Sequence, residues 1–127
     1  MNKNTGSPSR LIEVGPLADA LRRFAQERDW AQFHSPKNLA MALTAEVGEL
    51  VELFQWLNED DSRNVARDIR TAQAVRHELA DVLLYLVRLA DVLEVDLAQA
   101  VDEKLRLNAE KYPVDKARGT SRKYTDF

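Results

Sequence analysis

The sequence predicts an all-α fold built as a helical bundle. Three observations predict it: apolar residues recur every three or four positions over long stretches, no run of β-branched residues alternates with polar ones, and the 127 residues include only four Gly and four Pro. With 45% hydrophobic residues, a chain of this length can bury one core. The predicted organisation is a flexible N-terminal segment at 1–14, a helical domain at 15–112 and a basic tail at 113–127.

The first two helices are predicted from apolar spacing and from start signals. One helix is expected at 16–28, where leucine and phenylalanine side chains share a face. Ser35 is a good N-cap, and Pro36 suits the first helical position because its missing N–H group costs nothing there. The second helix is therefore expected to begin at Pro36, and its apolar repeat continues to about Leu57.

A third helical stretch is expected from Ser62 to Leu93, and its second half has an unusual composition. From Val75 onward, apolar residues cover most of the helix circumference. A helix that is apolar nearly all round must be buried nearly all round, which is difficult in a lone chain of this size. The sequence therefore predicts an obligate homo-oligomer.

The last predicted helix begins at Asp96, which acts as its N-cap, and ends at Lys111, since Pro113 disfavours helix at the residue before it. Residues 113–127 are expected to be extended or irregular. From Lys104 to the C-terminus the chain has seven basic and three acidic residues, whereas its net charge is −3. An acidic body is thus followed by a basic tail.

Composition also excludes several classes of function. The negative net charge argues against general nucleic-acid binding, which depends on Lys and Arg neutralising phosphates. The absence of cysteine excludes disulfides, thiolate nucleophiles and Cys-type zinc sites. No export signal or membrane-spanning stretch is recognisable, so a cytoplasmic protein without a membrane or nucleic-acid partner is expected.

Two pairs of carboxylates form the main candidate site. Glu46 and Glu49 lie in the second predicted helix, and Glu78 and Asp81 lie in the third. Residues three apart in a helix are one turn apart on neighbouring faces, so both pairs can point into one cleft. Among the glutamates of the second helix, Glu46 is expected to be less solvated than Glu49 and Glu52. The alternative is a solvated strip of charge.

Four carboxylates without Cys or His ligands suit Mg²⁺, with Mn²⁺ as a possible substitute. Carboxylate-bridged di-iron bundles place a histidine three residues after a glutamate, but Gln55 has that place after Glu52. His77 is expected to be structural or at the surface. Because Mg²⁺ is usually shared with substrate phosphates, the cleft predicts a phosphorylated substrate.

Other polar and aromatic residues are candidates for holding that substrate. An aromatic side chain near the carboxylates can stack on a nucleobase, although a core or subunit-interface role is the alternative for each aromatic. A loop hydrogen bond is the alternative for His34, and solvated surface charge is the alternative for the basic residues. The candidates for phosphate contacts are Asn108, Lys111, Arg122 and Lys123, and the candidates near a base are Trp30, Phe33, His34, Trp56 and Tyr85.

The pattern resembles the MazG-like all-α nucleoside triphosphate pyrophosphohydrolases, closest to their dCTP pyrophosphatase branch. The resemblance covers about residues 17–126. It rests on Glu46-x-x-Glu49 and Glu78-x-x-Asp81 separated by 28 residues, together with Arg28-Asp29-Trp30-x-Gln32-Phe33-His34, Phe54-Gln55-Trp56, Lys111-Tyr112-Pro113 and Ser121-Arg122-Lys123-Tyr124-Thr125.

The resemblance implies a four-helix bundle that hydrolyses a (deoxy)nucleoside triphosphate, dCTP or a 5-modified dCTP, to the monophosphate and pyrophosphate with Mg²⁺. It implies a tetramer assembled from dimers. It also implies that the four carboxylates are metal ligands and that base and sugar are surrounded by Trp30, Ala31, Gln32, Phe33, His34, Trp56 and Tyr85.

Two positions depart from the family pattern. Ala45 precedes Glu46, where the motif often has a second adjacent glutamate, and Leu21 stands where the dCTP branch has a substrate-contacting histidine. The second departure leaves the preferred base open, so a same-fold hydrolase for another nucleotide such as dUTP is an alternative. A non-catalytic helical oligomerisation module is another, and it predicts no metal dependence.

Overall fold

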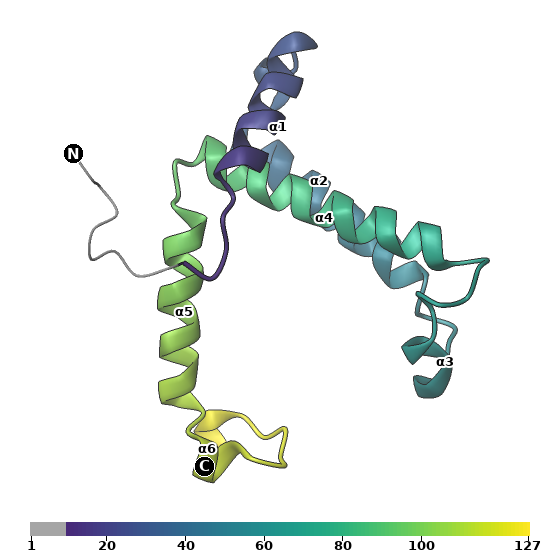
Figure 1. Cartoon of the computed structure of the whole chain (residues 1–127), viewed down its shortest axis with the longest axis vertical. Coiled ribbons are helices and arrows are strands. Elements are labelled where there is room, and N and C mark those ends of the chain that lie inside the picture. The colour runs from purple at the N-terminus through teal and green to yellow at the C-terminus, as the bar shows by residue number, and fades with distance from the viewer. Residues whose placement is uncertain (1–9) are drawn as a thin grey trace. The chain divides into compact units, whose positions relative to one another are not determined.

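The structure is a computed structural model that describes residues 10–127, so the prediction of a flexible segment at 1–14 lies mostly outside the described residues. No strand occurs in residues 10–127, which confirms the all-α class. None of the described helices is long and apolar enough to cross a bilayer. The helices are α1 (Gly15–Glu27), α2 (Pro36–Glu52), α3 (Glu59–Arg63), α4 (Ala72–Val92), α5 (Leu97–Lys111) and α6 (Val114–Ala117), with 3₁₀ turns η1 (Ala31–Phe33) and η2 (Tyr124–Asp126) (Figure 1).

The described chain forms two compact units, one at 15–95 and the other comprising 10–14 and 96–127. In the first unit, α2 and α4 lie side by side and run in opposite directions, and α1 packs against α4 (Figure 1). In the second unit, Arg10 forms an ion pair with Asp96 at 2.7 Å. The core of the first unit contains the buried apolar residues Ala25, Leu39, Val65, Val75, Val87 and Ala90.

Two predicted helix starts are confirmed by their capping hydrogen bonds. Ser35 Oγ accepts a hydrogen bond from the Asn38 N–H group at 3.1 Å, with Pro36 in the first turn of α2. Asp96 Oδ1 accepts one from the Gln99 N–H group, also at 3.1 Å, at the start of α5. Each cap satisfies a backbone donor that the helix itself leaves free.

The predicted end of the second helix near Leu57 is wrong. Helix α2 ends at Glu52, and most of the following N–H groups bond to the carbonyl three residues back, as Leu53 does to Leu50 at 3.1 Å and Phe54 to Val51 at 2.9 Å. These tighter turns continue the apolar spacing without an α-helical backbone, which is why the repeat alone suggests a longer helix. Trp56 consequently lies in a turn and not on the helix.

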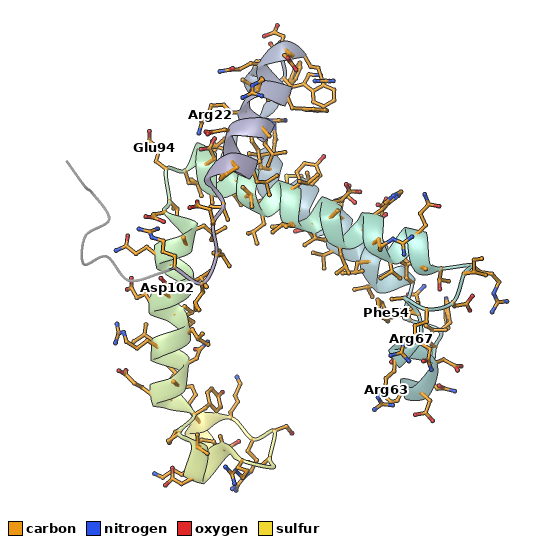
Figure 2. The ribbon with its side chains drawn as sticks, viewed as in Figure 1. Arg22, Phe54, Arg63, Arg67, Glu94 and Asp102 are labelled. Carbon is orange, nitrogen blue, oxygen red and sulfur yellow. The ribbon has the colours of Figure 1, made fainter. Side chains whose placement is uncertain are left out.

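The third predicted helix is also wrong in its first part, since the stretch from Ser62 is not continuous with α4. Asn58 caps the short helix α3, and turns follow at 64–71. The Thr71 hydroxyl donates a 2.6 Å hydrogen bond to the Val65 carbonyl and holds these turns together. Figure 2 shows that the Arg63 and Arg67 side chains come from this α3 region.

The prediction of an extended or irregular segment at 113–127 is partly wrong, because it contains α6 and η2. Pro113 has an extended backbone and begins α6. Three aromatic rings pack together in this unit, since Tyr112 lies 5.8 Å from both Tyr124 and Phe127 in edge-on geometry. Such pairs stabilise beyond the area they bury, so the tail adopts a folded structure on its own helix.

Helices α1 and α4 end in the same way, with a non-glycine residue in the left-handed region. Asp29 has φ of 55°, and Glu94 has φ of 58°. The next N–H group then reaches back to the last turn, from Trp30 to Ala25 at 2.8 Å and from Val95 to the corresponding carbonyl in α4 at 2.9 Å. These are Schellman-type ends, which glycine favours. The turn at Asp29 fixes the direction in which Trp30 leaves α1.

The Glu94→Gly variant is expected to be more stable by roughly 0.5–1 kcal/mol, because glycine avoids the left-handed penalty of a side chain at the cost of some chain entropy. Chemical denaturation monitored by circular dichroism measures this change. Arg76→Gly, at an exposed position inside α4, is the matched control and should destabilise by about 1 kcal/mol. Equal destabilisation by both substitutions would contradict this account of the helix end.

Helix α4 exposes an apolar stripe. Leu79, Leu83 and Leu86 follow a spacing of four and three residues and so share one face, yet they are exposed in the single chain by 54%, 48% and 39%. Asp81 and Tyr85 lie on the other side of the same helix, at about 100° per residue. The single chain thus leaves apolar surface of α4 open to solvent.

Candidate active site

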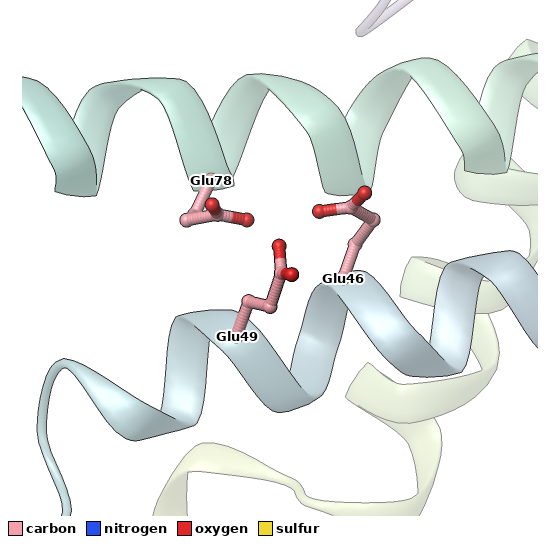
Figure 3. Close-up of side chains that lie close together, drawn as sticks. All are labelled: Glu46, Glu49 and Glu78. Atoms are coloured by element: carbon pink, nitrogen blue, oxygen red, sulfur yellow. The ribbon is translucent and has the colours of Figure 1, made fainter.

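Three carboxylates meet between α2 and α4. Oxygen atoms of Glu46, Glu49 and Glu78 lie within 4.8 Å of one another. Figure 3 shows the Glu46 and Glu49 side chains rising from α2 and the Glu78 side chain descending from α4 into the same space. The i, i+3 spacing on α2 puts two of them on one side of the helix, and the antiparallel partner supplies the third.

Burial and like charge make this cluster unfavourable without a cation. Glu46 Oε2 and Glu78 Oε2 are both buried and have no hydrogen-bond partner. Burial, together with the adjacent carboxyls of Glu78 and Glu49, raises the pKa of Glu46 to about 7. The expectation that Glu46 is the least solvated of its helix is confirmed, because Glu49 and Glu52 are exposed.

A divalent cation fits the donor set. The cluster offers hard oxygen ligands of one sign, and a cation between them would satisfy the two buried oxygen atoms that have no partner. Asp81 lies one turn further along α4, outside the trio, and its charge also contributes to the raised pKa of Glu46. His77 is exposed, as expected, and is not among the clustered residues.

The metal-free protein is expected to lose stability as pH rises from about 5 to about 8. Glu46 has a pKa of about 7 in the folded chain against an ordinary value of 4.5, so the folded state binds the proton more tightly and loses that advantage as it ionises. A saturating concentration of Mn²⁺ or Mg²⁺ should remove the loss, because the cation binds the ionised form. Melting temperatures recorded in chelator and in metal across this range test it.

The control for that series is Glu46→Gln. Burial and the charge of Arg88 lower the pKa of His34, an effect that by itself makes stability rise with pH up to the ordinary histidine pKa of 6.5. The difference between the wild-type and Glu46→Gln curves isolates the contribution of the Glu46 carboxylate to the pH dependence of stability. Parallel curves for the two proteins in chelator would show that Glu46 does not hold a proton in the folded state.

An apolar pocket of about 160 Å³ lies in the same unit. A cavity of about 150 Å³ can hold one benzene-sized ring, so the pocket suits a single aromatic ring. Aromatic and aliphatic side chains make most of its wall. Asp81, one helical turn after Glu78 on α4, also lines the pocket and so places it next to the carboxylate cluster. It is lined by Leu21, Phe24, Trp30, His34, Asp81, Leu84, Tyr85 and Arg88.

The polar wall of this pocket is held by a chain of charged hydrogen bonds. Arg88 as a whole residue is 8% exposed, and its Nε donates to His34 Nδ1 at 3.0 Å. Arg88 Nη1 donates to Asp91 Oδ2 at 3.2 Å. Arg22 of α1, labelled in Figure 2, holds the same carboxylate from the other side, with its Nη2 2.6 Å from Asp91 Oδ1. The guanidinium is thus buried with its charge paired, as burial of a charge requires.

Some predicted base contacts meet at this pocket and others do not. Trp30, His34 and Tyr85 line it together. Trp30 is fixed by edge-on packing on Phe24 at 5.8 Å. The remaining candidates are exposed and do not line it: Ala31, Gln32, Phe33 and Trp56. Trp56 is 86% exposed. Gln32 instead donates to the Asp29 carboxylate at 3.1 Å.

The predicted phosphate contacts all lie in the second unit. Asn108 and Lys111 belong to the last turns of α5, and the Lys111 ammonium stands 5.1 Å from the centre of the Tyr124 ring. Arg122 and Lys123 lie on the exposed stretch before η2. Their part in binding phosphate stays a prediction.

Sequence reasoning gave no role to Arg88, Phe24 or Leu84 at this pocket. Arg88 follows Tyr85 by three residues and Asp81 by seven, so helical spacing places all three on one face of α4. That spacing is the signal that identifies Arg88 as a pocket residue. Phe24 and Leu84 have the spacing of ordinary core residues, and no pattern separates them from the core.

Comparison with known proteins places the chain in a family. The MazG-like family model matches residues 41–127, which include all four carboxylates. The chain belongs to the MazG-like family. Among solved structures, this MazG-like chain resembles a pyrophosphatase from Archaeoglobus fulgidus with a TM-score of 0.73 and 40% sequence identity, covering 84% of this chain and 97% of that one.

Curated MazG-like relatives are similar over most of the chain. The dCTP pyrophosphatase 1 of Mus musculus is 49% identical over 116 residues, which cover 88% of this chain and 68% of the mouse protein. The dCTP pyrophosphatase 1 of Homo sapiens is 45% identical over 130 residues, which cover 98% of this chain and 76% of the human protein.

Proposed function

We propose that this MazG-like protein is a pyrophosphohydrolase that converts dCTP, or a 5-modified dCTP, to the monophosphate and pyrophosphate. The observation that carries the proposal is the carboxylate cluster of Glu46, Glu49 and Glu78 next to a pocket sized for one aromatic ring. The similarity to dCTP pyrophosphatase 1 of two mammals supports the choice of dCTP. Removal of unwanted nucleotides from the pool is the expected biological role.

Glu46, Glu49, Glu78 and Asp81 would hold Mg²⁺, with Mn²⁺ as a substitute. When bound, the cation supplies positive charge to the phosphates and lowers the pKa of a nearby water. Glu49 is exposed within the cluster, so it is the carboxylate best placed to take the proton of the attacking water. The water oxygen forms a bond to the α-phosphorus while the bond to the bridging oxygen breaks, and the electron pair leaves with pyrophosphate.

The pocket would hold the base, with Trp30 and Tyr85 as ring contacts. Aromatic rings stack on any nucleobase, so these residues supply affinity more than selectivity. Ala31, Gln32, Phe33 and Trp56 are proposed to close around base and sugar. Lys111, Arg122 and Lys123 are proposed to neutralise phosphate oxygens, and the Asn108 amide is proposed to donate a hydrogen bond to them.

The oligomer is proposed to complete the four-helix bundle. The exposed stripe of Leu79, Leu83 and Leu86 gives each chain an apolar helix face that a second copy can cover, and a tetramer assembled as a dimer of dimers would do so in closed symmetry. The three-part organisation at 1–14, 15–112 and 113–127 and the cytoplasmic location are further parts of this proposal.

Pyrophosphate release from a panel of deoxynucleoside triphosphates, with Mg²⁺ and with chelator, tests the function. The panel includes dCTP, 5-substituted dCTP, dUTP and the other canonical nucleotides. Mg²⁺-dependent release that is fastest with dCTP or its 5-substituted forms is the expected result. Faster release from dUTP would show that the preferred substrate carries another base. No release from any nucleotide would favour the non-catalytic oligomerisation module.

A further inference from the structure

Arg88 is buried beside the pocket, yet the reaction proposed above does not use it. Its guanidinium touches neither the carboxylate cluster nor the exposed surface, since its side chain is 9% exposed and paired with Asp91. A buried ion pair is a poor way to add stability, because the cost of removing two charges from water offsets their attraction. The position of this guanidinium therefore calls for another explanation.

The hydrogen bond to His34 supplies that explanation. Arg88 Nε is always protonated and can only donate, so His34 Nδ1, 3.0 Å away, has to accept. A neutral imidazole carries one hydrogen, and acceptance at Nδ1 places it on Nε2. Burial and the nearby Arg88 charge lower the pKa of His34, which keeps the ring neutral. Nε2–H is then a fixed donor on the opposite side of the ring from Arg88.

Each partner in this arrangement is itself held in place. Asp91 binds Arg88 Nη1, and its two oxygens also accept from Arg22 at 2.6 Å and 3.2 Å. The backbone of the His34 loop is fixed by hydrogen bonds from the His34 N–H group to the Ala31 carbonyl at 3.1 Å and from Asn38 Nδ2 to the Phe33 carbonyl at 3.0 Å. The backbone that carries the imidazole is therefore held in place, and the hydrogen bond from Arg88 sets which ring nitrogen faces α4.

We propose that Arg88 is a positioning residue that fixes His34 as the Nε2–H tautomer and thereby makes His34 a hydrogen-bond donor to the acceptor edge of a pyrimidine base in the pocket. This inference rests on the proposed function, in which the pocket holds the base. Cytosine offers an acceptor at ring nitrogen N3, where uracil and thymine carry a hydrogen. A fixed donor opposite N3 therefore favours cytosine. In this chain the donor would be His34, because Leu21, which also lines the pocket, has no donor group.

The tautomer is measured directly by long-range ¹H–¹⁵N NMR of the imidazole nitrogens. The chain has two histidines, so a His77→Asn background leaves a single imidazole to observe. The expected spectrum shows His34 with its hydrogen on Nε2 and a bare Nδ1. Arg88→Met removes the donor and is expected to give a mixture of the two tautomers, whereas Arg88→Lys keeps a donor and should retain the Nε2–H form. A wild-type ring with hydrogen on Nδ1 would overturn the proposal whether or not the variants fold.

Kinetics separate positioning from general damage. Arg88→Met is expected to raise KM for dCTP about twofold for an equal mixture of the two tautomers, with little change in kcat, because only the Nε2–H form donates to the base, and to lower the preference for dCTP over dUTP. Arg23→Met, which removes an exposed cation of α1 next to Arg22, is the matched control and should leave both constants unchanged. An unchanged KM and base preference in Arg88→Met would contradict the proposal.

The nucleotide panel and the Arg88 experiments test the proposed function and the role of Arg88 separately. If no nucleotide is hydrolysed, the proposed function is wrong, but the NMR measurement still shows whether Arg88 fixes the His34 tautomer. If dCTP is hydrolysed and the Arg88→Met protein behaves like the Arg23→Met control, the function stands and the role given to Arg88 is wrong.

Discussion

The Glu78→Gln variant is expected to lose pyrophosphate release from dCTP by at least about a hundredfold, because loss of a cation ligand removes several kcal/mol of transition-state stabilisation. Glu78 supplies the carboxylate that α4 contributes to the cluster, and its Oε2 is buried without a partner. The amide that replaces it cannot hold a divalent cation with the same charge. Initial rates at saturating Mg²⁺ and dCTP measure the loss.

The thermal stability of the metal-free Glu78→Gln variant should rise, although its activity falls. Without metal, the three clustered carboxyls disfavour one another, so Glu78→Gln is expected to melt at a higher temperature than the wild type in chelator. Glu52→Gln is the matched control, since Glu52 is exposed on α2 outside the cluster, and it should change neither quantity. Full activity of Glu78→Gln would exclude the assignment of this carboxylate to the site.

The Leu83→Glu variant is expected to dissociate the proposed oligomer. Leu83 lies in the middle of the exposed stripe of α4, and burying one leucine side chain stabilises by about 1.5–3 kcal/mol. In a symmetric assembly every substitution occurs in each copy, and like charges would face one another across the interface. Sedimentation velocity should show a multiple of 14.5 kDa for the wild type and the single-chain mass for the variant.

Gln73→Glu is the control for that experiment, because it adds the same charge at an exposed position of α4 outside the stripe. It should keep the wild-type mass. The melting temperature of Leu83→Glu should also fall, since the interface contributes to the stability of each chain. A wild-type protein that sediments as a single chain would contradict the proposed assembly.

The sequence predicts most helix boundaries in this chain to within one residue, and the exceptions are the end of α2 and the start of α4. Ser35 and Asp96 are capping residues with side chains that act locally, so their effect is visible in the sequence. The ends depend on how the backbone continues. Leu53 shifts to a tighter hydrogen bond, and Asp29 and Glu94 adopt a left-handed conformation, although none of the three is a glycine or proline.

The carboxylate cluster is predictable because the i, i+3 spacing and the apolar neighbours of Glu78 are both sequence properties. The Arg88–His34 hydrogen bond is not predictable in the same way, because it joins residues 54 positions apart. That pairing depends on the way α1 and its loop pack on α4. The helical spacing of Arg88 with Tyr85 and Asp81 places it on the pocket face of α4, but it does not show which side chain the guanidinium meets.

Helix α4 also fixes the distance between the carboxylate cluster and the ring pocket. Glu78 and Tyr85 are seven residues apart on one unbroken helix, and at about 1.5 Å per residue this sets roughly 10 Å along the axis between the level of the cluster and the level of the ring contact. A continuous α-helix keeps this separation whatever is bound. A molecule that engages both levels at once has to carry its charged groups and its ring at a matching separation. Free pyrophosphate and an unphosphorylated nucleoside each reach one level alone, so molecular length becomes a criterion of selection.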